Sequence, residues 1–113
     1  MHINGNATQG ENIADLGGML LGLDAFKKTA AYKKNEKIGG LTQVQRYFLG
    51  YALGWMYQVK KDRLASRVKT DVHAPAKERV NGPVVNIPEF YEAFGIKPGD
   101  KMYRADSLRV RIW

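Results

Sequence analysis

The stretch TQGENIADLGG, residues 8–18, decides how this chain is interpreted. Thr8 and Glu11 have the spacing of a capping box, in which two side chains bond each other's backbone N–H groups at the start of a helix. Apolar residues then recur every three or four positions. This periodicity predicts a helix over residues 8–34.

One face of that helix combines acids with small residues. Glu11 and Asp15 lie one turn apart, and Gly18 and Gly22 continue the same face. Each glycine inside a helix costs about 0.5–1 kcal/mol relative to alanine, and like charges one turn apart add to that cost. Two interpretations account for it. Either the face packs tightly and Glu11 only completes the cap, or one carboxylate coordinates a metal ion and the other orients a ligating imidazole.

The middle of the chain predicts further helices. Thr42 and Gln45 repeat the capping-box spacing and begin a helix over residues 42–61. This helix is apolar on nearly every face, so we expect it to be central and covered on all sides. A short helix over residues 63–70 should follow, and Pro75 prevents its continuation.

The C-terminal third predicts mostly turns. VNGPVVN, residues 80–86, indicates a turn with at most a short extended piece. Pro88 and Gly95 should bound one short helix, and KPGD, residues 97–100, indicates another turn. The final RVRIW, residues 109–113, is either a brief strand or an anchored tail. The fold class is therefore mainly α, with turns and at most short strands near the C-terminus.

The composition is that of an ordinary globular chain. Its 113 residues suffice for one domain, and the absence of cysteine excludes disulfides and thiolate zinc sites. The formal net charge is +7, but the basic residues are scattered pairs without a stripe or a reading motif. We interpret them as solvated helix faces and expect no nucleic-acid partner. The stretch MHINGNATQG contains no signal peptide, and no apolar run approaches the ~20 residues of a membrane-spanning helix.

A second group of candidate site residues lies in TDVHAPAKERV, residues 70–80. His73 follows Asp71 by two positions, and Arg79 comes six positions later. A carboxylate beside an imidazole can fix its tautomer or favour its cationic form. A cationic imidazole with an arginine nearby can stabilise an oxyanion or hold a substrate carbonyl. Ordinary hydrogen bonding within a loop also accounts for the pattern.

Three motifs together resemble the C-terminal part of the neprilysin family of zinc metallopeptidases. They are NGNATQGENIADLGG, then KTDVHAPAKERVNGPV followed by PEFYEAFG, and the terminal RVRIW. They occur in the order expected for that family, and the resemblance covers residues 2–113. It implies the helical C-terminal part of a thermolysin-like zincin catalytic domain that hydrolyses peptides.

The resemblance also assigns a role to each candidate residue. It implies that Glu11 is the third ligand of a catalytic zinc ion and that Asp15 orients one ligating histidine. It makes His73 the group that stabilises the tetrahedral oxyanion, with Asp71 as its supporting acid. Arg79 corresponds to the arginine that binds a backbone carbonyl of the substrate. The small-residue face is similar to the one on which the HExxH helix lies.

The chain departs from the family in one respect, because its only histidines are His2 and His73 and it contains no HExxH. A zinc site of this type needs three protein ligands, a water and a general base. We therefore expect residues 1–113 to be a single partial domain, the C-terminal segment of a metallopeptidase. Zinc would belong to the complete enzyme, with none bound by this chain alone, and the substrates would be peptides.

Some expectations concern the chain as a separate molecule. Its exposed small-residue face and its aromatic second helix should leave unusual apolar surface, which predicts self-association or a bound partner. An alternative function is a stand-alone, non-catalytic interaction module, and a weaker one is a zinc site made by His2, Glu11 and His73 within or between copies. Trp113 should be packed rather than catalytic. The absence of cysteine favours a bacterial source, and the resemblance leaves the cellular location open.

Overall fold

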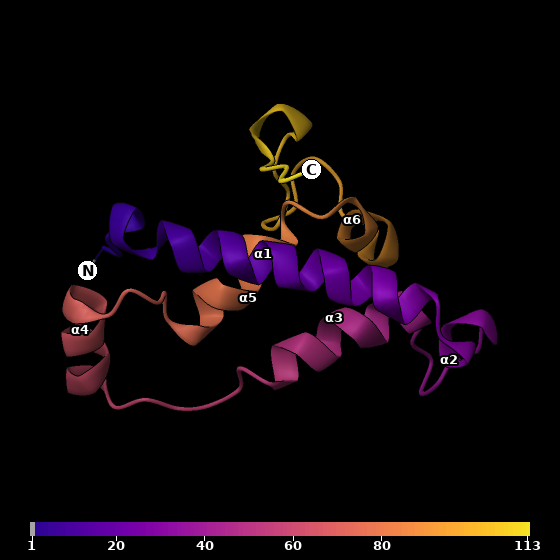
Figure 1. Cartoon of the computed structure of the whole chain (residues 1–113), viewed down its shortest axis with the longest axis horizontal. Helices are drawn as coiled ribbons and strands as arrows, with labels where there is room; N and C mark the ends of the chain where they lie inside the picture. Colours follow the sequence, from indigo (N-terminus) through magenta and orange to yellow (C-terminus); the bar gives the residue numbers. More distant parts are fainter. Residues whose placement is uncertain (1) are drawn as a thin grey trace.

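A computed structural model describes residues 2–113, which are mainly α-helical (Figure 1). The fold class predicted from the sequence is confirmed. Within this part of the chain the only β pairing is an isolated antiparallel bridge between Ile38 and Leu41. None of the helices there is long and apolar enough to cross a membrane. The elements are α1 Gly5–Lys27, α2 Ala30–Lys33, α3 Gln43–Leu53, α4 Lys61–Thr70, α5 Ala76–Val84, α6 Pro88–Phe94 and the 3₁₀ helix η1 Asp106–Leu108.

Helix α1 begins earlier than the capping-box pattern predicts. Asn4 is the N-cap, and its side chain accepts a hydrogen bond from the Ala7 N–H at 3.3 Å. Thr8 is buried inside the helix, where its hydroxyl donates to the Asn4 carbonyl at 3.3 Å. The predicted start at Thr8 is therefore wrong, because Asn4 is a good capping residue one turn upstream.

The predicted helix over residues 8–34 is also interrupted. Helix α1 ends at Lys27, and Thr29 takes an extended conformation with φ −75° and ψ 154°. Its hydroxyl accepts a hydrogen bond from the Tyr32 N–H at 3.2 Å and so caps the short α2. A threonine hydroxyl that bonds backbone groups of residues nearby in the sequence competes with helix continuation, which explains the break.

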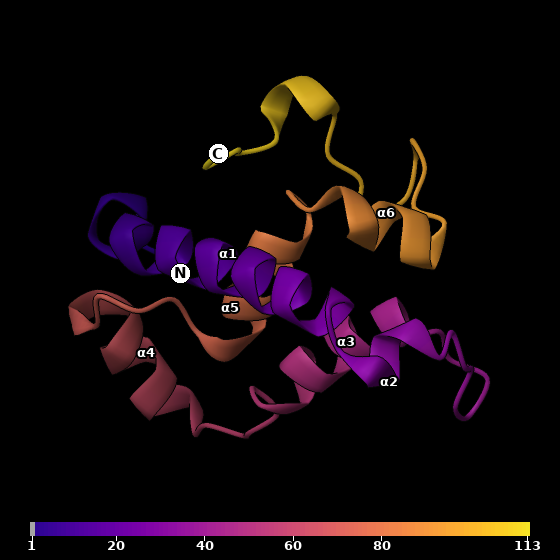
Figure 2. The same cartoon turned by 45° about the vertical axis from the view of Figure 1, so that its right-hand side comes forward.

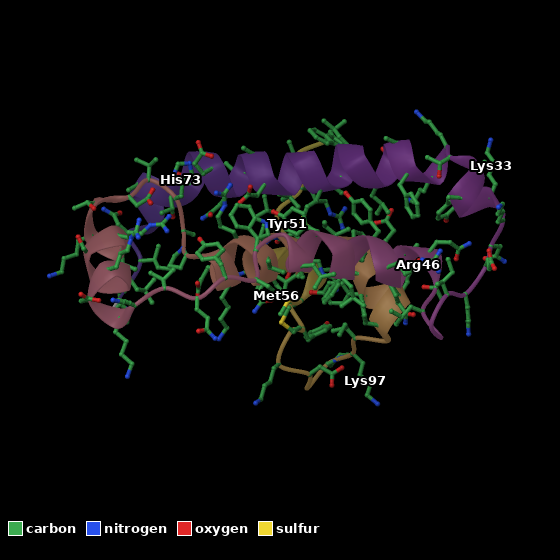
Figure 3. All side chains as sticks on the ribbon, turned by 90° about the horizontal axis from the view of Figure 1, so that it is seen from below. Lys33, Arg46, Tyr51, Met56, His73 and Lys97 are labelled. Atoms are coloured by element: carbon green, nitrogen blue, oxygen red, sulfur yellow. The ribbon has the colours of Figure 1, made fainter. Side chains whose placement is uncertain are left out.

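Helix α3 starts as predicted, with Thr42 and Gln45 in a reciprocal capping box. It ends at Leu53, well before the predicted residue 61. The helix is not covered on all sides either, since Leu49 and Leu53 are 40% and 65% exposed. Figure 3 shows Tyr51 on the side of α3 that faces α1, with Met56 beyond the helix and away from α1. Helix α4, in contrast, lies close to its predicted range.

Residues 80–84 are helical where a turn was predicted, because α5 continues to Val84 with Pro83 in its last turn, and only residues 85–86 form a turn. Proline lacks an N–H, so the carbonyl of Arg79 has no intrahelical donor. The hydroxyl of Tyr51 donates to that carbonyl at 3.3 Å. A side chain of α3 thus compensates for the proline and ties α3 to α5.

The predictions for residues 88–100 are confirmed. Helix α6 begins at Pro88, and Gly95 ends it in the left-handed region with φ 63°, as predicted. Residues 97–100 form the predicted turn, in which the Asp100 N–H donates to the Lys97 carbonyl at 3.1 Å.

Of the two readings of residues 109–113, the structure shows the tail. The Val110 N–H donates to the Asn86 side chain at 2.9 Å. Trp113 lies beside Gly17 of α1 yet remains 72% exposed, so the expectation that it is packed is wrong for this chain.

The core forms on the inner side of α1. Helix α1 runs along α5 and α3, and α6 packs against α3, whereas α4 lies at one end of the molecule (Figures 1 and 2). The buried side chains that form the core are Leu16, Met19, Leu23, Phe48, Val84 and Ile87. This packing fixes α1 and α5 side by side, which places their polar residues next to one another.

Candidate functional site

The five candidate residues gather along one stretch of α1. Glu11 and Asp15 come from α1, Arg79 from α5, and Asp71 and His73 from the segment that follows α4. The Nε2 atom of His73 lies 3.4 Å from Oε2 of Glu11, although the residues are far apart in sequence. The structure therefore joins the two motifs that the sequence analysis treated separately.

Asp71 contacts His73 in two ways. Its Oδ1 atom accepts a hydrogen bond from the His73 backbone N–H at 2.9 Å and lies 2.8 Å from ring atom Nδ1. Because a carboxylate only accepts, Nδ1 must carry the hydrogen in this arrangement. These bonds from the backbone and ring of His73, followed by those from Arg67, lower the pKa of Asp71 to about 2. The acid is thereby kept ionised beside the imidazole.

The sequence analysis missed Arg67, whose guanidinium holds the other oxygen of Asp71. Its Nε and Nη2 atoms donate to Oδ2 at 3.1 and 3.0 Å. The hydrogen bonds to Asp71 raise the pKa of Arg67 above its ordinary value, with a smaller contribution from Tyr57. The spacing of four residues on a helix is a signal that could have indicated this pair.

Asp15 and Arg79 form a bidentate ion pair between α1 and α5. The Nε and Nη2 atoms of Arg79 donate to the two carboxylate oxygens of Asp15, each at 2.7 Å. The side chains are only 16% and 11% exposed for Arg79 and Asp15, respectively. The hydrogen bonds to Asp15 raise the pKa of Arg79. The guanidinium is therefore fixed in direction, and its Nη1 atom is the nitrogen that this pair leaves available.

Two aromatic residues complete the surroundings of Arg79. The ring of Trp55 covers the guanidinium, with Cζ of Arg79 4.1 Å from the ring centroid. Tyr51 donates to the Arg79 carbonyl, and burial, followed by the negative charge of Asp15, raises the pKa of its hydroxyl. No local pattern in the sequence indicates these contacts, because they depend on how α3 packs against α5.

The described residues do not form a complete metal site. Across residues 2–113 no group of three His, Cys, Asp or Glu side chains converges to hold an ion, so His2, Glu11 and His73 make no such site within one copy. A catalytic zinc ion needs three protein ligands. The side chain of Glu11 is 43% exposed beside His73, so its carboxylate is accessible as an oxygen donor.

The small-residue face of α1 is only partly occupied. A Cβ atom added at Gly22 would lie 2.5 Å from the hydroxyl of Tyr47, so this side chain of α3 reaches the surface of α1 at that point. At Gly18 the same atom would meet nothing within 4 Å. Gly22 therefore makes room for the Tyr47 side chain, while Gly18 lies on an open part of the face.

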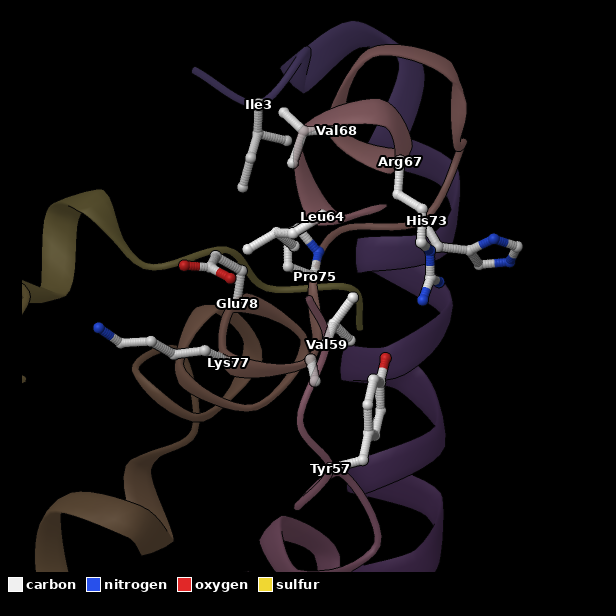
Figure 4. A pocket seen from close by; sticks show the side chains of 11 residues that line it. Ile3, Tyr57, Val59, Leu64, Arg67, Val68, His73, Pro75, Lys77 and Glu78 are labelled. Carbon is white, nitrogen blue, oxygen red and sulfur yellow. The ribbon is translucent and has the colours of Figure 1, made fainter. Parts of the chain in front are cut away.

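A cavity of about 330 Å³ lies behind the His73 segment (Figure 4). Apolar side chains line most of it, among them Val59, Leu64 and Pro75. Figure 4 shows the ring of His73 pointing away from this cavity, towards α1. The cavity thus lies on the opposite side of His73 from Glu11.

Comparison with known proteins gives consistent results. Residues 1–110 match the model of peptidase family M13. The chain is 42% identical over 110 residues to neutral endopeptidase of Lactococcus lactis subsp. lactis, covering 97% of this chain and 16% of that protein. It is 38% identical over 115 residues to membrane metallo-endopeptidase-like 1 of Mus musculus, covering 99% and 15%.

Solved structures agree with these matches. A zinc metalloprotease of Mycobacterium tuberculosis superimposes with a TM-score of 0.86 at 35% identity, covering 99% of this chain and 17% of that one. PepO from Lactobacillus rhamnosis superimposes with a TM-score of 0.81 at 37% identity, covering 98% and 16%. The chain spans about a sixth of the length of the curated relatives it matches.

Proposed function

The chain belongs to peptidase family M13, and on this basis we propose that residues 1–113 supply part of the active site of a zinc metalloendopeptidase. The observation that carries the proposal is the 3.4 Å approach of Glu11 to His73, beside the bidentate pair of Asp15 and Arg79. The HExxH ligands and the general base would come from polypeptide outside this chain. Residues 1–113 would then act on peptides only as part of the complete enzyme.

Glu11 would be the third protein ligand of the metal. Its half-exposed carboxylate at the open side of α1 is a suitable oxygen donor. A zinc ion held there would supply Lewis-acid polarisation of a scissile carbonyl and would activate a water molecule. Asp15, one turn further along, would orient one of the ligating histidines through whichever lone pairs its bond to Arg79 leaves available.

His73 would stabilise the oxyanion that forms when the carbonyl is attacked. Its Nδ1–H is directed to Asp71, so Nε2 is the atom that faces the Glu11 side. In the cationic form of the imidazole, Nε2 carries a hydrogen and can donate a hydrogen bond to a developing negative charge. Asp71 would hold the ring in this orientation throughout.

Arg79 would bind a backbone carbonyl of the peptide substrate. Asp15 occupies its Nε and Nη2 atoms, and Trp55 covers one face of the guanidinium. A substrate carbonyl would therefore receive its hydrogen bond from Nη1 in a direction that the pair has already fixed. Pre-organised donors of this kind lower the cost of positioning a substrate.

The proposal is tested in a complete family member that carries this segment. We expect Glu11→Ala to lose zinc and activity together. We expect His73→Ala to retain zinc while kcat falls by about 10²–10³. Glu92→Ala, at an exposed position of α6, is the control and should change neither zinc content nor kcat. Full activity in His73→Ala would contradict the role of His73, and full zinc content in Glu11→Ala would contradict the role of Glu11.

As a separate molecule, the chain would self-associate. Exposed apolar side chains support this proposal, among them Leu21 of α1, Leu53 at the end of α3 and Met56 beyond it, which are 64%, 65% and 76% exposed. Sedimentation across the micromolar range tests it, and a monomer at every concentration would contradict it. Reading the coding sequence upstream of Met1 distinguishes the two functions. An HExxH segment in frame supports the peptidase, whereas a stop codon favours a stand-alone, non-catalytic interaction module.

A further inference from the structure

The carboxylate of Asp71 divides its two oxygens between two partners. Oδ1 serves His73, through the backbone N–H at 2.9 Å and ring atom Nδ1 at 2.8 Å. Oδ2 serves Arg67, through Nε at 3.1 Å and Nη2 at 3.0 Å. A rotation of the carboxylate would break both sets of bonds. The position of one partner is therefore coupled to that of the other.

Asp71 lies at the end of a helix that is not part of the core. Helix α4 contains no buried residue, and the segment before it, residues 54–60, contains no helix or strand. Asp71 is the C-cap of α4, where its N–H donates to the Arg67 carbonyl at 2.8 Å. Arg67 therefore binds Asp71 twice. Its carbonyl accepts a hydrogen bond from the Asp71 N–H, and its guanidinium donates to the Asp71 carboxylate.

We propose that Arg67 is a positioning residue for His73, which it acts on through Asp71. By holding Oδ2 it keeps Oδ1 aligned with Nδ1 of the imidazole, and this leaves Nε2 directed towards Glu11. The geometry stands on the contacts of this chain alone. Its consequence for catalysis rests on the proposed function, in which Nε2 donates to the oxyanion.

The residue type matters at position 67. Two guanidinium nitrogens converge on one oxygen in a planar arrangement, which limits rotation of the carboxylate. A lysine would keep the positive charge but offer a point contact on a flexible stem. We therefore expect Arg67→Lys to keep only part of the alignment between Asp71 and His73 that a neutral residue at position 67 would lose.

The test follows the ring proton of His73 by nuclear magnetic resonance in the chain itself. Arg67→Met removes the guanidinium but keeps a long stem and a good helix former. Arg63→Met is the matched control, because Arg63 lies one turn earlier on α4 at an exposed position. Arg67→Lys is the conservative variant. Backbone shifts of α4 confirm in each sample that the helix is retained.

The wild-type chain and Arg63→Met should show a slowly exchanging Nδ1 proton and the ¹⁵N shifts of an Nδ1–H imidazole. In Arg67→Met that proton should exchange faster by about tenfold or more, because the hydrogen bond to Asp71 is no longer fixed. Arg67→Lys should fall between the two. Unchanged exchange and ring shifts in Arg67→Met would overturn the proposal, as would a wild-type imidazole that carries its hydrogen on Nε2 and none on Nδ1.

This experiment is independent of peptidase activity. An Arg67→Met variant that leaves the ring of His73 unchanged would refute the positioning role and leave the proposed function as it stands. Conversely, zinc retained by Glu11→Ala in a complete enzyme would refute the proposed function without touching the Arg67 contacts. The two failures are therefore distinguishable.

Discussion

The candidate site joins two regions that are built in different ways. The packed half consists of α1, α3 and α5 and holds the pair of Asp15 and Arg79, whose side chains are 11% and 16% exposed. The peripheral half consists of α4 and residues 71–75 and holds the pair of Asp71 and His73, whose side chains are 23% and 39% exposed. Each half presents an acid bonded to a cationic or titratable base. Only the first lies between helices that share the core.

This difference separates stability from positioning. In the packed half, the pair is placed by helix packing, so the free energy of unfolding should depend on it. In the peripheral half, the buried Ala74 anchors the backbone and polar contacts orient the partly exposed imidazole, so a change in those contacts should alter local geometry more than global stability. We therefore expect substitutions in the packed half to lower the free energy of unfolding, and substitutions in the peripheral half to change mainly the local geometry around His73.

The largest expected effect comes from Asp15→Ala. Removing one partner of a largely buried pair leaves the guanidinium of Arg79 without its counter-charge, and breaking buried pairs costs 3–5 kcal/mol. Because this pair retains some exposure, we expect a loss of about 2–3 kcal/mol in the free energy of unfolding, measured by urea denaturation. A much smaller loss of free energy would mean that the pair of Asp15 and Arg79 contributes no more to stability than the pair of Asp71 and His73.

Asp24→Ala is the matched control for that experiment. Asp24 lies on the same helix at an exposed position, so its removal should change the free energy of unfolding by no more than about 0.5 kcal/mol. Asp71→Ala extends the comparison to the peripheral half. Its effect on global unfolding should be smaller than that of Asp15→Ala, although the contacts of His73 would be lost.

A pair of glycines sharpens the description of the packed half. Gly22→Ala would place a methyl group 2.5 Å from the Tyr47 hydroxyl, which donates to the Met19 carbonyl at 2.7 Å. Tyr47 stacks on Phe26 with a centroid distance of 5.9 Å, so its ring has little room to move. We expect a destabilisation of about 1–2 kcal/mol by urea denaturation, after the gain from helix propensity is included.

Gly18→Ala makes the opposite prediction on the same helix. Its added methyl group meets nothing within 4 Å, so the substitution should stabilise the chain by about 0.5–1 kcal/mol. Destabilisation in this variant would mean that the open face is covered in solution, for example by a second copy. Equal effects in both glycine variants would contradict the close approach of α3 at Gly22.

The fold could be predicted from the sequence where local chemistry acts alone. The capping box of Thr42 and Gln45 and the stop at Gly95 depend on neighbouring residues, and both are present. The start of α1 could not be settled in this way, because Asn4 and Thr8 are both suitable caps and only one is used. The helical conformation around Pro83 depends on Tyr51, a residue of another helix, and so has no local signal.

The candidate site was predictable in its residues but not in its pairing. Spacing on a helix placed Glu11 and Asp15 on one face, and the family resemblance suggested that His73 and Arg79 belong with them. That Arg79 binds Asp15 follows from the packing of α5 on α1, which one sequence does not reveal. Arg67 was missed because an arginine four residues before an aspartate is a common surface pattern.

The smallest expected effect is a local acid transition in the peripheral half. The pKa of Asp71 lies at about 2 in the folded chain, below its ordinary value of 3.8. A carboxyl with a lowered pKa contributes stability above the ordinary value, and this contribution disappears as the pH falls from about 3.8 to about 2. The His73 amide resonance should report a midpoint near pH 2, while core amides of α1 do not change at that step. Arg67→Met should shift this midpoint upward, because Arg67 is one of the groups that hold the carboxylate ionised. A wild-type midpoint near 3.8 would mean that His73 and Arg67 do not hold Asp71 in solution, and the two halves would then differ in more than packing.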